Sequence, residues 1–400
     1  MIMKFTEYEM EVLRSFNQIN PSIIFNPGHK VATISNNKNI LASANFKQVS
    51  FPKQAPIYDL SNLISSINIL ATDDKPDINF GDNYSLDIAT WNIEWFPKNG
   101  QTTSNHVSDI IRNLDLDIIA IQEVDDTVIF DLMVDDLQDY SGYYESAWFA
   151  GLAYIYKTGS IEINDIYEIY TTSPYWSAFP RSPMVMDINF MGDNYFLINN
   201  HLKCCGDGAL DTSDASDEEN RRFIAMNLLK QYIDDNLPGQ NVIVLGDLND
   251  DIAEESTNNV FQNILEDSEN YFFSDIEIAN GPSSHWSFPN WPSHLDHILI
   301  TNEIFNGLTR IQTQTIKIDS YMDGGWSEYD YNVSDHRPVA IKIFNFTTFY
   351  DLNDDGLVDN SDLEILVSYV IEQSTYGDIN QNSKVDIFDL LTMADFLYFF

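Results

Sequence analysis

Basic residues are scarce in this chain of 400 residues, where 20 Lys and Arg stand against 62 Asp and Glu and give a formal net charge of −42. So acidic a chain repels polyanions unless salt or bound cations screen the charge. The composition therefore excludes a broad basic groove for nucleic acid.

Cysteine and long apolar runs are also lacking. The only two cysteines, Cys204 and Cys205, are neighbours and cannot join distant segments, so the sequence holds no disulfide framework. The pair predicts either a strained vicinal disulfide or two thiols. No run of 18 apolar residues is present, which excludes a membrane-spanning helix. Residues 1–16 carry Glu in every turn and do not read as a secretory signal.

What is present indicates a globular protein of two or three domains. Hydrophobic residues make up 44% of the chain, enough to fill a sizeable core. Charge changes abruptly along it: residues 1–83 hold 7 basic and 8 acidic residues, residues 84–344 hold 12 and 43, and residues 345–400 hold 1 and 11. We therefore predict three pieces with these boundaries.

The first piece, residues 1–83, is predicted to be a small α+β segment. A helical period runs through Met10, Leu13, Phe16 and Ile19, and the runs SIIFN, KVATIS and ILASANF are typical of strands. Together with APIYDLSNLISSINIL, this stretch resembles the amino-terminal part of the sliding clamp of tailed phages. The alternatives are a small accessory piece or a fusion of unrelated fragments.

The central piece, residues 84–344, alternates strands and helices. Strands are predicted at 86–96, 116–124, 153–157, 184–190, 195–203, 241–250, 295–301 and 337–344, and helices at 104–115 and 219–237. This order predicts an α/β fold in which two sheets pack together and helices flank them.

Polar side chains recur where these strands begin or end. Strand ends converge on one rim of a sheet, so distant residues can share one pocket; those at the ends are Asn92, Glu123, His201, Asp247, Asn249, Asp296 and His336, with Asp335 beside the last. Carboxylate, amide and imidazole groups without thiolate are suited to Mg²⁺ or Mn²⁺ and phosphate.

Seven strings in order resemble the endonuclease/exonuclease/phosphatase family of DNase I-like enzymes: ATWNIEWF, IIAIQEV, FPRSPMV, NNHLK, VLGDLND, HLDHILI and SDHRPVAI. They cover residues 84–344. The resemblance implies a four-layer α/β sandwich that cleaves phosphoester bonds with a divalent cation.

The resemblance also implies roles for the matching residues. Glu123 would ligate Mg²⁺, with Asn92 holding the metal or phosphate and Asp335 at the metal edge. Asp247 and Asn249 would orient the attacking water and bind the scissile phosphate. Asp296 would pair with His336, as general base or in transition-state stabilisation, while His201 and Arg181 would contact the phosphoryl group.

Each of these residues also has a structural interpretation. Asp and Asn after a strand often form turns, Arg181 suits a surface ion pair, and His285, His294 and His297 suit structural histidines. The joint order of the seven strings favours the functional interpretation. An inserted loop after His201 is a departure from the family pattern, and its Asp207, Asp211, Asp214 and Asp217 would either hold a structural Ca²⁺ or simply be solvated.

The last piece, residues 345–400, contains two acidic dodecamers at an offset of 27, DLNDDGLVDNSD and DINQNSKVDIFD, each followed by an apolar helix. Oxygen side chains occupy loop positions 1, 3, 5, 9 and 12, a spacing that wraps a loop around one Ca²⁺: Asp351, Asn353, Asp355, Asp359 and Asp362, then Asp378, Asn380, Asn382, Asp386 and Asp389. This resembles the type I dockerin module, which implies a cohesin-like partner and an extracellular or cell-surface protein.

The sequence as a whole predicts a metal-dependent phosphodiester hydrolase, foremost a DNase-like nuclease. The alternatives are a phosphatase or lipid phosphodiesterase of the same fold, which the acidic central piece favours, and a catalytically silent interaction protein.

Overall fold

The computed structural model describes residues 12–13, 15–17, 19–20, 22–34, 41–45, 55–57, 78–82, 85–145, 150–305, 309–345, 350, 352–353, 358–372, 374, 376–377, 379 and 384–399. The chain divides into two compact units, residues 1–77 with 370–392 and residues 78–369 with 393–400. The predicted calcium ligands Asp351, Asp355, Asp378, Asn380 and Asn382 lie outside the described residues.

The first 83 residues contain the three predicted strands and a fourth. β1 (Ile23–Phe25) pairs antiparallel with β4 (Ala55–Ile57), and β2 (Lys30–Ile34) pairs antiparallel with β3 (Leu41–Asn45). β2 alternates buried and exposed residues, as a strand with one covered face does. At the other end of the chain, α11 (Asn360–Glu372) and α12 (Ile387–Phe399) follow the two acidic dodecamers.

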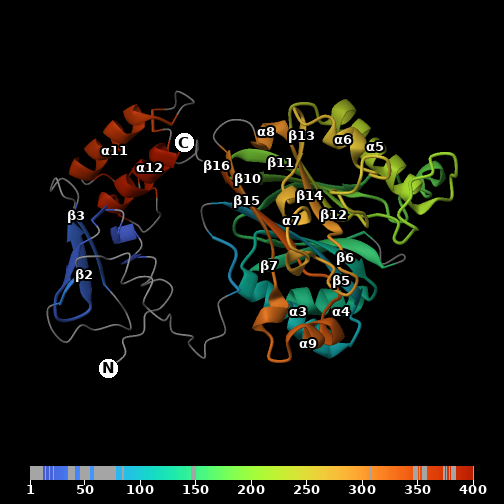
Figure 1. Ribbon diagram of the computed structural model, residues 1–400, viewed down its shortest axis with the longest axis horizontal. Coiled ribbons are helices and arrows are strands. Elements are labelled where there is room, and N and C mark those ends of the chain that lie inside the picture. Colours follow the sequence, from blue (N-terminus) through green and yellow to red (C-terminus); the bar gives the residue numbers. More distant parts are fainter. Residues whose placement is uncertain are drawn as a thin grey trace. The chain divides into compact units, whose positions relative to one another are not determined.

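Two six-stranded sheets make up the central piece. The first has the order β15-β16-β5-β6-β8-β7 and the second β13-β14-β12-β11-β10-β9 (Figure 1). The first is built from β5 (Leu86–Phe96), β6 (Ile118–Val124), β7 (Tyr140–Tyr144), β8 (Gly151–Lys157), β15 (Thr309–Thr315) and β16 (Val339–Asn345). The second is built from β9 (Glu162–Glu168), β10 (Met184–Phe190), β11 (Asp193–His201), β12 (Asn241–Asp247), β13 (Tyr271–Phe273) and β14 (Asp296–Thr301).

Each sheet has one parallel pair at its centre, β5 with β6 and β11 with β12, and all other neighbours are antiparallel. Consequently β14 and β16 run against the parallel pairs. The first residues of β14 and β16 therefore lie at the rim where β5, β6, β11 and β12 end.

Helices cover the outer face of each sheet (Figure 1). The first sheet is covered by α3 (Gln101–Leu114), α4 (Thr127–Asp135) and α9 (Gly325–Asn332), with η3 (Ile318–Tyr321) beside α9. The second is covered by α5 (Glu218–Asn236), α6 (Gln262–Leu265) and α7 (Ile276–Ala279); the remaining short elements are α8 (Asn302–Phe305), η1 (Ser173–Tyr175) and η2 (Ser283–His285). This layering is the predicted four-layer α/β sandwich.

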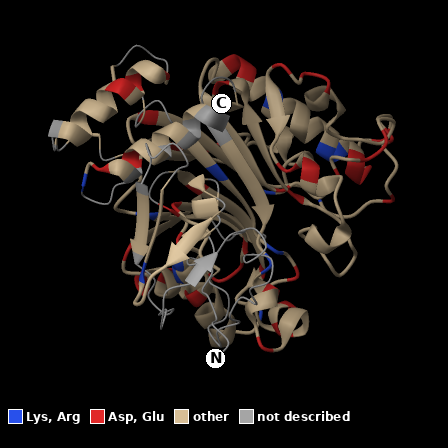
Figure 2. Cartoon of the chain, turned by 60° about the vertical axis from the view of Figure 1, so that its left-hand side comes forward, with Lys and Arg blue, Asp and Glu red and all other residues tan. Residues whose placement is uncertain are grey.

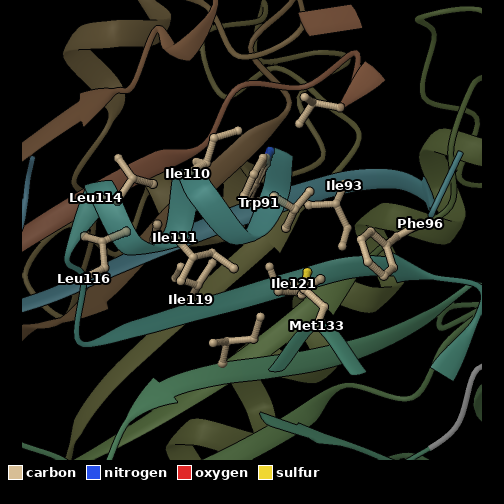
Figure 3. Packing of buried hydrophobic residues seen from close by; sticks show 14 of the residues in the cluster. Trp91, Ile93, Phe96, Ile110, Ile111, Leu114, Leu116, Ile119, Ile121 and Met133 are labelled. Carbon is tan, nitrogen blue, oxygen red and sulfur yellow. The ribbon is translucent and has the colours of Figure 1, made fainter. Parts of the chain in front are cut away.

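Three hydrophobic cores hold the layers together. Along β5, Leu86 and Ile88 belong to the core between the sheets, whereas Ala89 belongs to the core under α3. Trp91 and Ile93 pack in this second core, beside Ile110 and Ile111 of α3 (Figure 3). The alternation follows the period of two along a strand, so one buried strand supplies two cores.

Buried polar groups tie the two sheets together beneath the rim. Asn199 of β11 donates from Nδ2 to the carbonyl oxygens of Ile121 and Ala153, both at 3.0 Å, and accepts from Gln122 Nε2 at 2.8 Å. Asn199 is fully buried, so water cannot take its place as the hydrogen-bond partner of these groups. The Asn199 amide therefore fixes the position of β11 relative to β6 and β8 of the other sheet.

Four strands that the sequence analysis did not predict, β7, β9, β13 and β15, are the outermost strands of the two sheets. Edge strands are buried on fewer sides and carry polar residues, as in EINDIYE and TRIQTQT, so their hydrophobic period is weak. The ten predicted central strands and helices are all present. Within the described residues, no helix is long and apolar enough to cross a membrane.

We predict that Asn199→Ala lowers the free energy of unfolding by about 2 kcal/mol or more, because Gln122 and two buried carbonyls lose their partner. Urea denaturation followed by circular dichroism measures it. Asn164→Ala is the control: Asn164 is an exposed asparagine that also bonds between strands, and its loss should cost no more than about 0.5 kcal/mol. Equal losses in the two variants would show that the inter-sheet contact is not special.

Candidate active site

Side chains from both sheets meet at the rim described above. Asn92 and Glu123 come from β5 and β6, and His201 and Asp247 are the last residues of β11 and β12. Asp296 begins β14 and pairs in register with Asp247. His336 lies three residues before β16. The predicted convergence of strand ends is therefore what the structure shows.

Asn92 joins the two sheets at this rim. Its Nδ2 donates to Glu123 Oε1 at 3.1 Å and to Asp247 Oδ2 at 3.0 Å, while its Oδ1 accepts from the Glu94 backbone N–H at 2.9 Å. The side chain is 1% exposed, so these bonds form away from water. Asn92 thus holds the two carboxylates by its amide nitrogen, and the predicted metal contact of its oxygen stays a prediction.

Glu123 is fixed from two sides. Oε2 accepts from the Trp95 backbone N–H at 2.9 Å, and Oε1 lies 3.8 Å from His201 Nε2. Glu123 has a φ of 68°, a left-handed conformation unusual for a non-glycine residue, and it ends the buried run of β6 with a partly exposed carboxylate. The carboxylate is therefore held at the rim where a cation can reach it.

Glu94 extends the acidic cluster, and sequence reasoning missed it. Its carboxylate pairs with Lys98 and accepts from the Asp335 backbone N–H at 2.9 Å. Burial is the main cause that raises the pKa of Glu94 and of Asp335. The only sequence signal was an acidic residue two positions after Asn92, and its contact with Asp335 spans 241 positions.

Asp247 is almost fully buried, with 2% of its surface exposed. Burial first, then the nearby Asp296 and Glu123 charges, raise its pKa to about 7, although His336 and the Asn92 bond favour the charged form. Its Oδ1 accepts from the Asn249 backbone N–H at 3.1 Å. A carboxylate with a pKa near neutrality is suited to take up a proton.

The two site histidines are held in opposite charge states. His336 Nδ1 lies 2.8 Å from Asp296 Oδ2, and its Nε2 faces Asp247 and Asp335 at 3.8 and 3.9 Å. Burial lowers the pKa of His336, but these carboxylates outweigh it and raise the pKa to about 10. Burial, with the positive charges of Arg181 and His336, lowers the pKa of His201 well below its ordinary value. His336 is a cation at neutral pH, and His201 is neutral.

Backbone contacts position His336 from behind. Ser334 Oγ donates to the Asn92 carbonyl at 2.7 Å and accepts from the His336 backbone N–H at 2.9 Å. Tyr329 Oη donates to the His336 carbonyl at 2.6 Å and accepts from Trp91 Nε1 at 3.0 Å. These contacts link the site to the core under α3, and sequence patterns carried no sign of them.

The remaining predicted residues lie at the edge of this group. Arg181, in the loop before β10, donates from Nε to the Ala150 carbonyl at 3.1 Å, and its charge interacts with Glu123 and Asp247. Asn249 is half-buried and donates from Nδ2 to the Leu202 carbonyl at 3.3 Å. The structure thus brings Arg181 to the site rather than to a surface ion pair.

The other histidines of the central piece lie outside this group of side chains. His294 and His297 are buried and both contact Asp275 Oδ2, at 3.0 and 2.6 Å, which fits their interpretation as structural histidines. His285 is exposed. Ser287 donates its backbone N–H to His294 Nδ1 at 3.3 Å, so Nδ1 is an acceptor and the ring proton lies on Nε2. His294 Nε2 then donates to Asp275.

Some acidic residues of the inserted loop after His201 form hydrogen bonds within the loop. Asp211 and Asp214 each accept from the serine two residues further on, whereas Asp207 and Asp217 come together with Glu219. Cys204 and Cys205 are exposed free thiols with Sγ atoms 3.0 Å apart. The Ca²⁺ alternative for this loop stays a prediction.

The rim fits a divalent cation. Asp247 and Asp296 place carboxylate oxygens within 4.8 Å of each other, and Asp296 Oδ1 is buried with no hydrogen-bond partner among the described residues. Glu94, Glu123 and Asp335 add three more carboxylates against Lys98 and Arg181. Oxygen donors with an excess of negative charge are what Mg²⁺ or Mn²⁺ requires.

Comparison with known proteins agrees with this geometry. The model of the Endonuclease/Exonuclease/phosphatase family matches residues 89–336. No curated protein matches the chain in sequence. A structure of D. rerio TDP2 complexed with single strand DNA product is 13% identical, with 66% of this chain and 100% of that chain covered and a TM-score of 0.50. The human Nocturnin catalytic domain with bound sulfate anion is 15% identical, with 66% and 96% covered and a TM-score of 0.48.

We predict that Asp296→Asn lowers the pKa of His336 from about 10 toward its ordinary value of 6.5, because the amide accepts the same hydrogen bond without the charge. The folded-state pKa is raised, so the pair stabilises the fold fully below about pH 6.5 and loses that effect as the pH rises through about 10. NMR titration of the ring in EDTA measures the pKa. Asp165→Asn, at an exposed carboxylate on β9, should change nothing; an unmoved pKa in Asp296→Asn would refute the assignment.

Proposed function

The chain belongs to the endonuclease/exonuclease/phosphatase family, and we propose that it is a divalent-metal-dependent phosphodiester hydrolase that acts on nucleic acid or nucleotide esters. The observation that carries the proposal is the meeting of Asn92, Glu123, His201, Asp247 and His336 at one rim, with Arg181 beside them. The D. rerio TDP2 neighbour, crystallised with a single strand DNA product, supports nucleic acid as the substrate class.

Glu123, with Asp335 and Glu94 beside it, would hold Mg²⁺ or Mn²⁺. When bound, the cation supplies Lewis-acid stabilisation of charge on the phosphoryl oxygens. The remaining chemistry comes from the side chains. Arg181 is a planar donor able to bind two phosphate oxygens, and the neutral His201 donates from Nε2 without adding charge.

We assign to Asp247 the role of the base that removes the proton from the attacking water. The family leaves open whether an aspartate or a histidine removes it, and here the charges distinguish them. His336 is already protonated, with a pKa of about 10, so it has no free pair on Nε2 and acts as a cationic donor to the transition state. The pKa of Asp247, about 7, suits a base, and its bond from the Asn249 N–H fixes its direction.

The charge of the central piece supports the second candidate, a phosphatase or lipid phosphodiesterase. Residues 84–344 hold 12 basic and 43 acidic residues, and Figure 2 shows acidic positions spread over helices and loops with few basic ones among them. Long polyanions gain affinity from many cationic contacts. For the first candidate, the nucleic-acid hydrolase, the same charge favours short or single-stranded substrates over duplex DNA.

We predict that Glu123→Gln lowers kcat/KM for bis-p-nitrophenyl phosphate by a hundredfold or more in Mg²⁺, because a charged ligand at the rim is lost. Glu162→Gln, an exposed glutamate on β9, should retain full activity. His201→Ala is expected to fall as far as Glu123→Gln. The full chain is assayed with Mg²⁺ and with EDTA, against plasmid DNA, RNA and p-nitrophenyl phosphate over a salt series.

Two outcomes would change the assignment. Cleavage confined to the monoester p-nitrophenyl phosphate would make the protein a phosphatase. Activity that survives in both Glu123→Gln and His201→Ala would place the chemistry elsewhere.

For the tail we propose Ca²⁺ binding by the two acidic repeats, as in a dockerin-like module with a cohesin-like partner. The described parts of the two loops are alike: Asp362 accepts from the Asp359 backbone N–H at 2.8 Å, and Asp389 accepts from the Asp386 N–H at the same distance. Asp362 and Asp389 are both fully buried at the start of a helix, and Asn353 also donates its N–H to Asp362. The repeat in sequence thus supports a repeat in structure.

We predict that Ca²⁺ protects residues 345–400 from proteolysis and that EDTA removes the protection, because a ligand that binds only the folded loop stabilises it. Limited trypsin or thermolysin digestion followed by mass spectrometry measures it. Asp362→Ala should abolish the effect in its own repeat, whereas Glu364→Gln, an exposed acid two residues further on, should keep it. Identical digestion with and without Ca²⁺ would contradict the proposal.

A further inference from the structure

A cavity of about 420 Å³ opens beside Arg181, on the side of the site where β8 and β9 lie. Its lining includes Leu152 of β8, Glu168 at the end of β9, and a loop segment that runs through Trp176, Phe179, Arg181 and Ser182. Small-molecule sites in proteins commonly have volumes of about 300–1,000 Å³ and are mostly apolar with a few polar groups. The cavity has this size and character.

The indole of Trp176 is the distinctive group of this lining. The residue is 60% exposed, yet its Nε1 donates to the Thr171 carbonyl at 3.2 Å, so the ring is held in place. Phe179, also in the lining, is buried and stacks on Tyr170, with ring centres 5.1 Å apart and an angle of 9° between the planes. A large aromatic face that is fixed and open to solvent is suited to stack against a flat ring.

Arg181 connects this cavity to the catalytic groups. Its charge interacts with those of Glu123 and Asp247, and its Nε bond to the Ala150 carbonyl orients the guanidinium. Arg181 thus lines the cavity and also interacts with two carboxylates of the rim. Trp176 and Arg181 both line this one cavity.

The polar groups of the lining narrow the chemistry further. Glu168 and Ser182 offer hydrogen bonds at the edge of an otherwise apolar wall. Burial raises the pKa of Glu168, so its protonated form, which is a donor as well as an acceptor, persists to a higher pH than that of an ordinary glutamate. An acyl chain offers no hydrogen bond to these two groups, and a polyol such as inositol offers no flat apolar face to Trp176. A planar ring with polar atoms on its edge satisfies both.

We propose that this cavity binds the nucleobase attached to the scissile phosphate, with Trp176 stacking on the base and Arg181 holding the phosphate. The inference rests on the proposed phosphodiester hydrolysis and specifies its substrate as a nucleotide ester or the end of a single strand. The excess of acidic over basic residues agrees with it, because one base and one phosphate need few cationic contacts.

The test compares two matched diesters, thymidine 5′-(methyl phosphate) and the same compound without its base, 1,2-dideoxyribose 5-(methyl phosphate). Full-length wild type in Mg²⁺ should prefer the nucleotide by about tenfold in kcat/KM, mainly through KM, because base stacking is lost in the second compound. Trp176→Ala should remove that preference and leave hydrolysis of the abasic diester unchanged. Trp176→Phe should keep most of it, and Phe272→Ala, which alters an exposed aromatic of another cavity, should keep all of it.

A binding measurement separates this proposal from the proposed function. Saturation-transfer NMR with uncharged thymidine reports occupation of the cavity without any reaction. Thymidine contact that disappears in Trp176→Ala, in a protein that hydrolyses neither diester, would support the cavity and refute the hydrolase. Hydrolysis with no preference for the nucleotide, together with thymidine contact unchanged by Trp176→Ala, would overturn the cavity assignment and leave the hydrolase intact.

Discussion

Burial of neighbouring carboxylates is the constraint around which the site is built. Burial first, and then the charges of Asp296 and Glu123, raise the pKa of Asp247, and this arrangement costs free energy unless it is offset. The Asn92 amide bonded to two of them, the His336 cation bonded to a third, and the charge of Arg181 provide that offset. A divalent cation would complete it, so affinity for metal and stability of the rim have one physical origin.

The sequence carried most of this site because its members fall at strand ends. Asn92, Glu123, Asp247 and Asp296 each sit where a buried apolar run begins or stops, and parallel pairing of β5 with β6 and of β11 with β12 brings those points to one rim. The outermost strands were missed for the opposite reason, since edge strands such as β9 are polar and their burial is slight. Glu94, Ser334 and Tyr329 were missed because their contacts join positions that only the finished fold brings together.

Charge states could not have been predicted from residue types alone. The two site histidines have the same side chain, yet three carboxylates raise the pKa of His336, whereas burial, with the charges of Arg181 and His336, lowers the pKa of His201. In the proposed mechanism, the raised pKa of His336 is the reason why the proton-accepting role goes to Asp247 and not to this histidine. The same dependence on surroundings applies to Arg181, which the sequence pattern alone would place in a surface ion pair and whose charge in the structure interacts with Glu123 and Asp247.

The two sheets have the same pattern of strand pairing, one parallel pair flanked by antiparallel neighbours, but they are not consecutive in the chain. The second sheet, residues 162–301, is inserted whole between β8 and β15 of the first. As a result β16, the last strand of the central piece, inserts beside β5, its first, and brings His336 with it. During synthesis on the ribosome, a chain that ends before β16 lacks this strand, so the rim that gathers the polar side chains is complete only after the whole central piece has emerged.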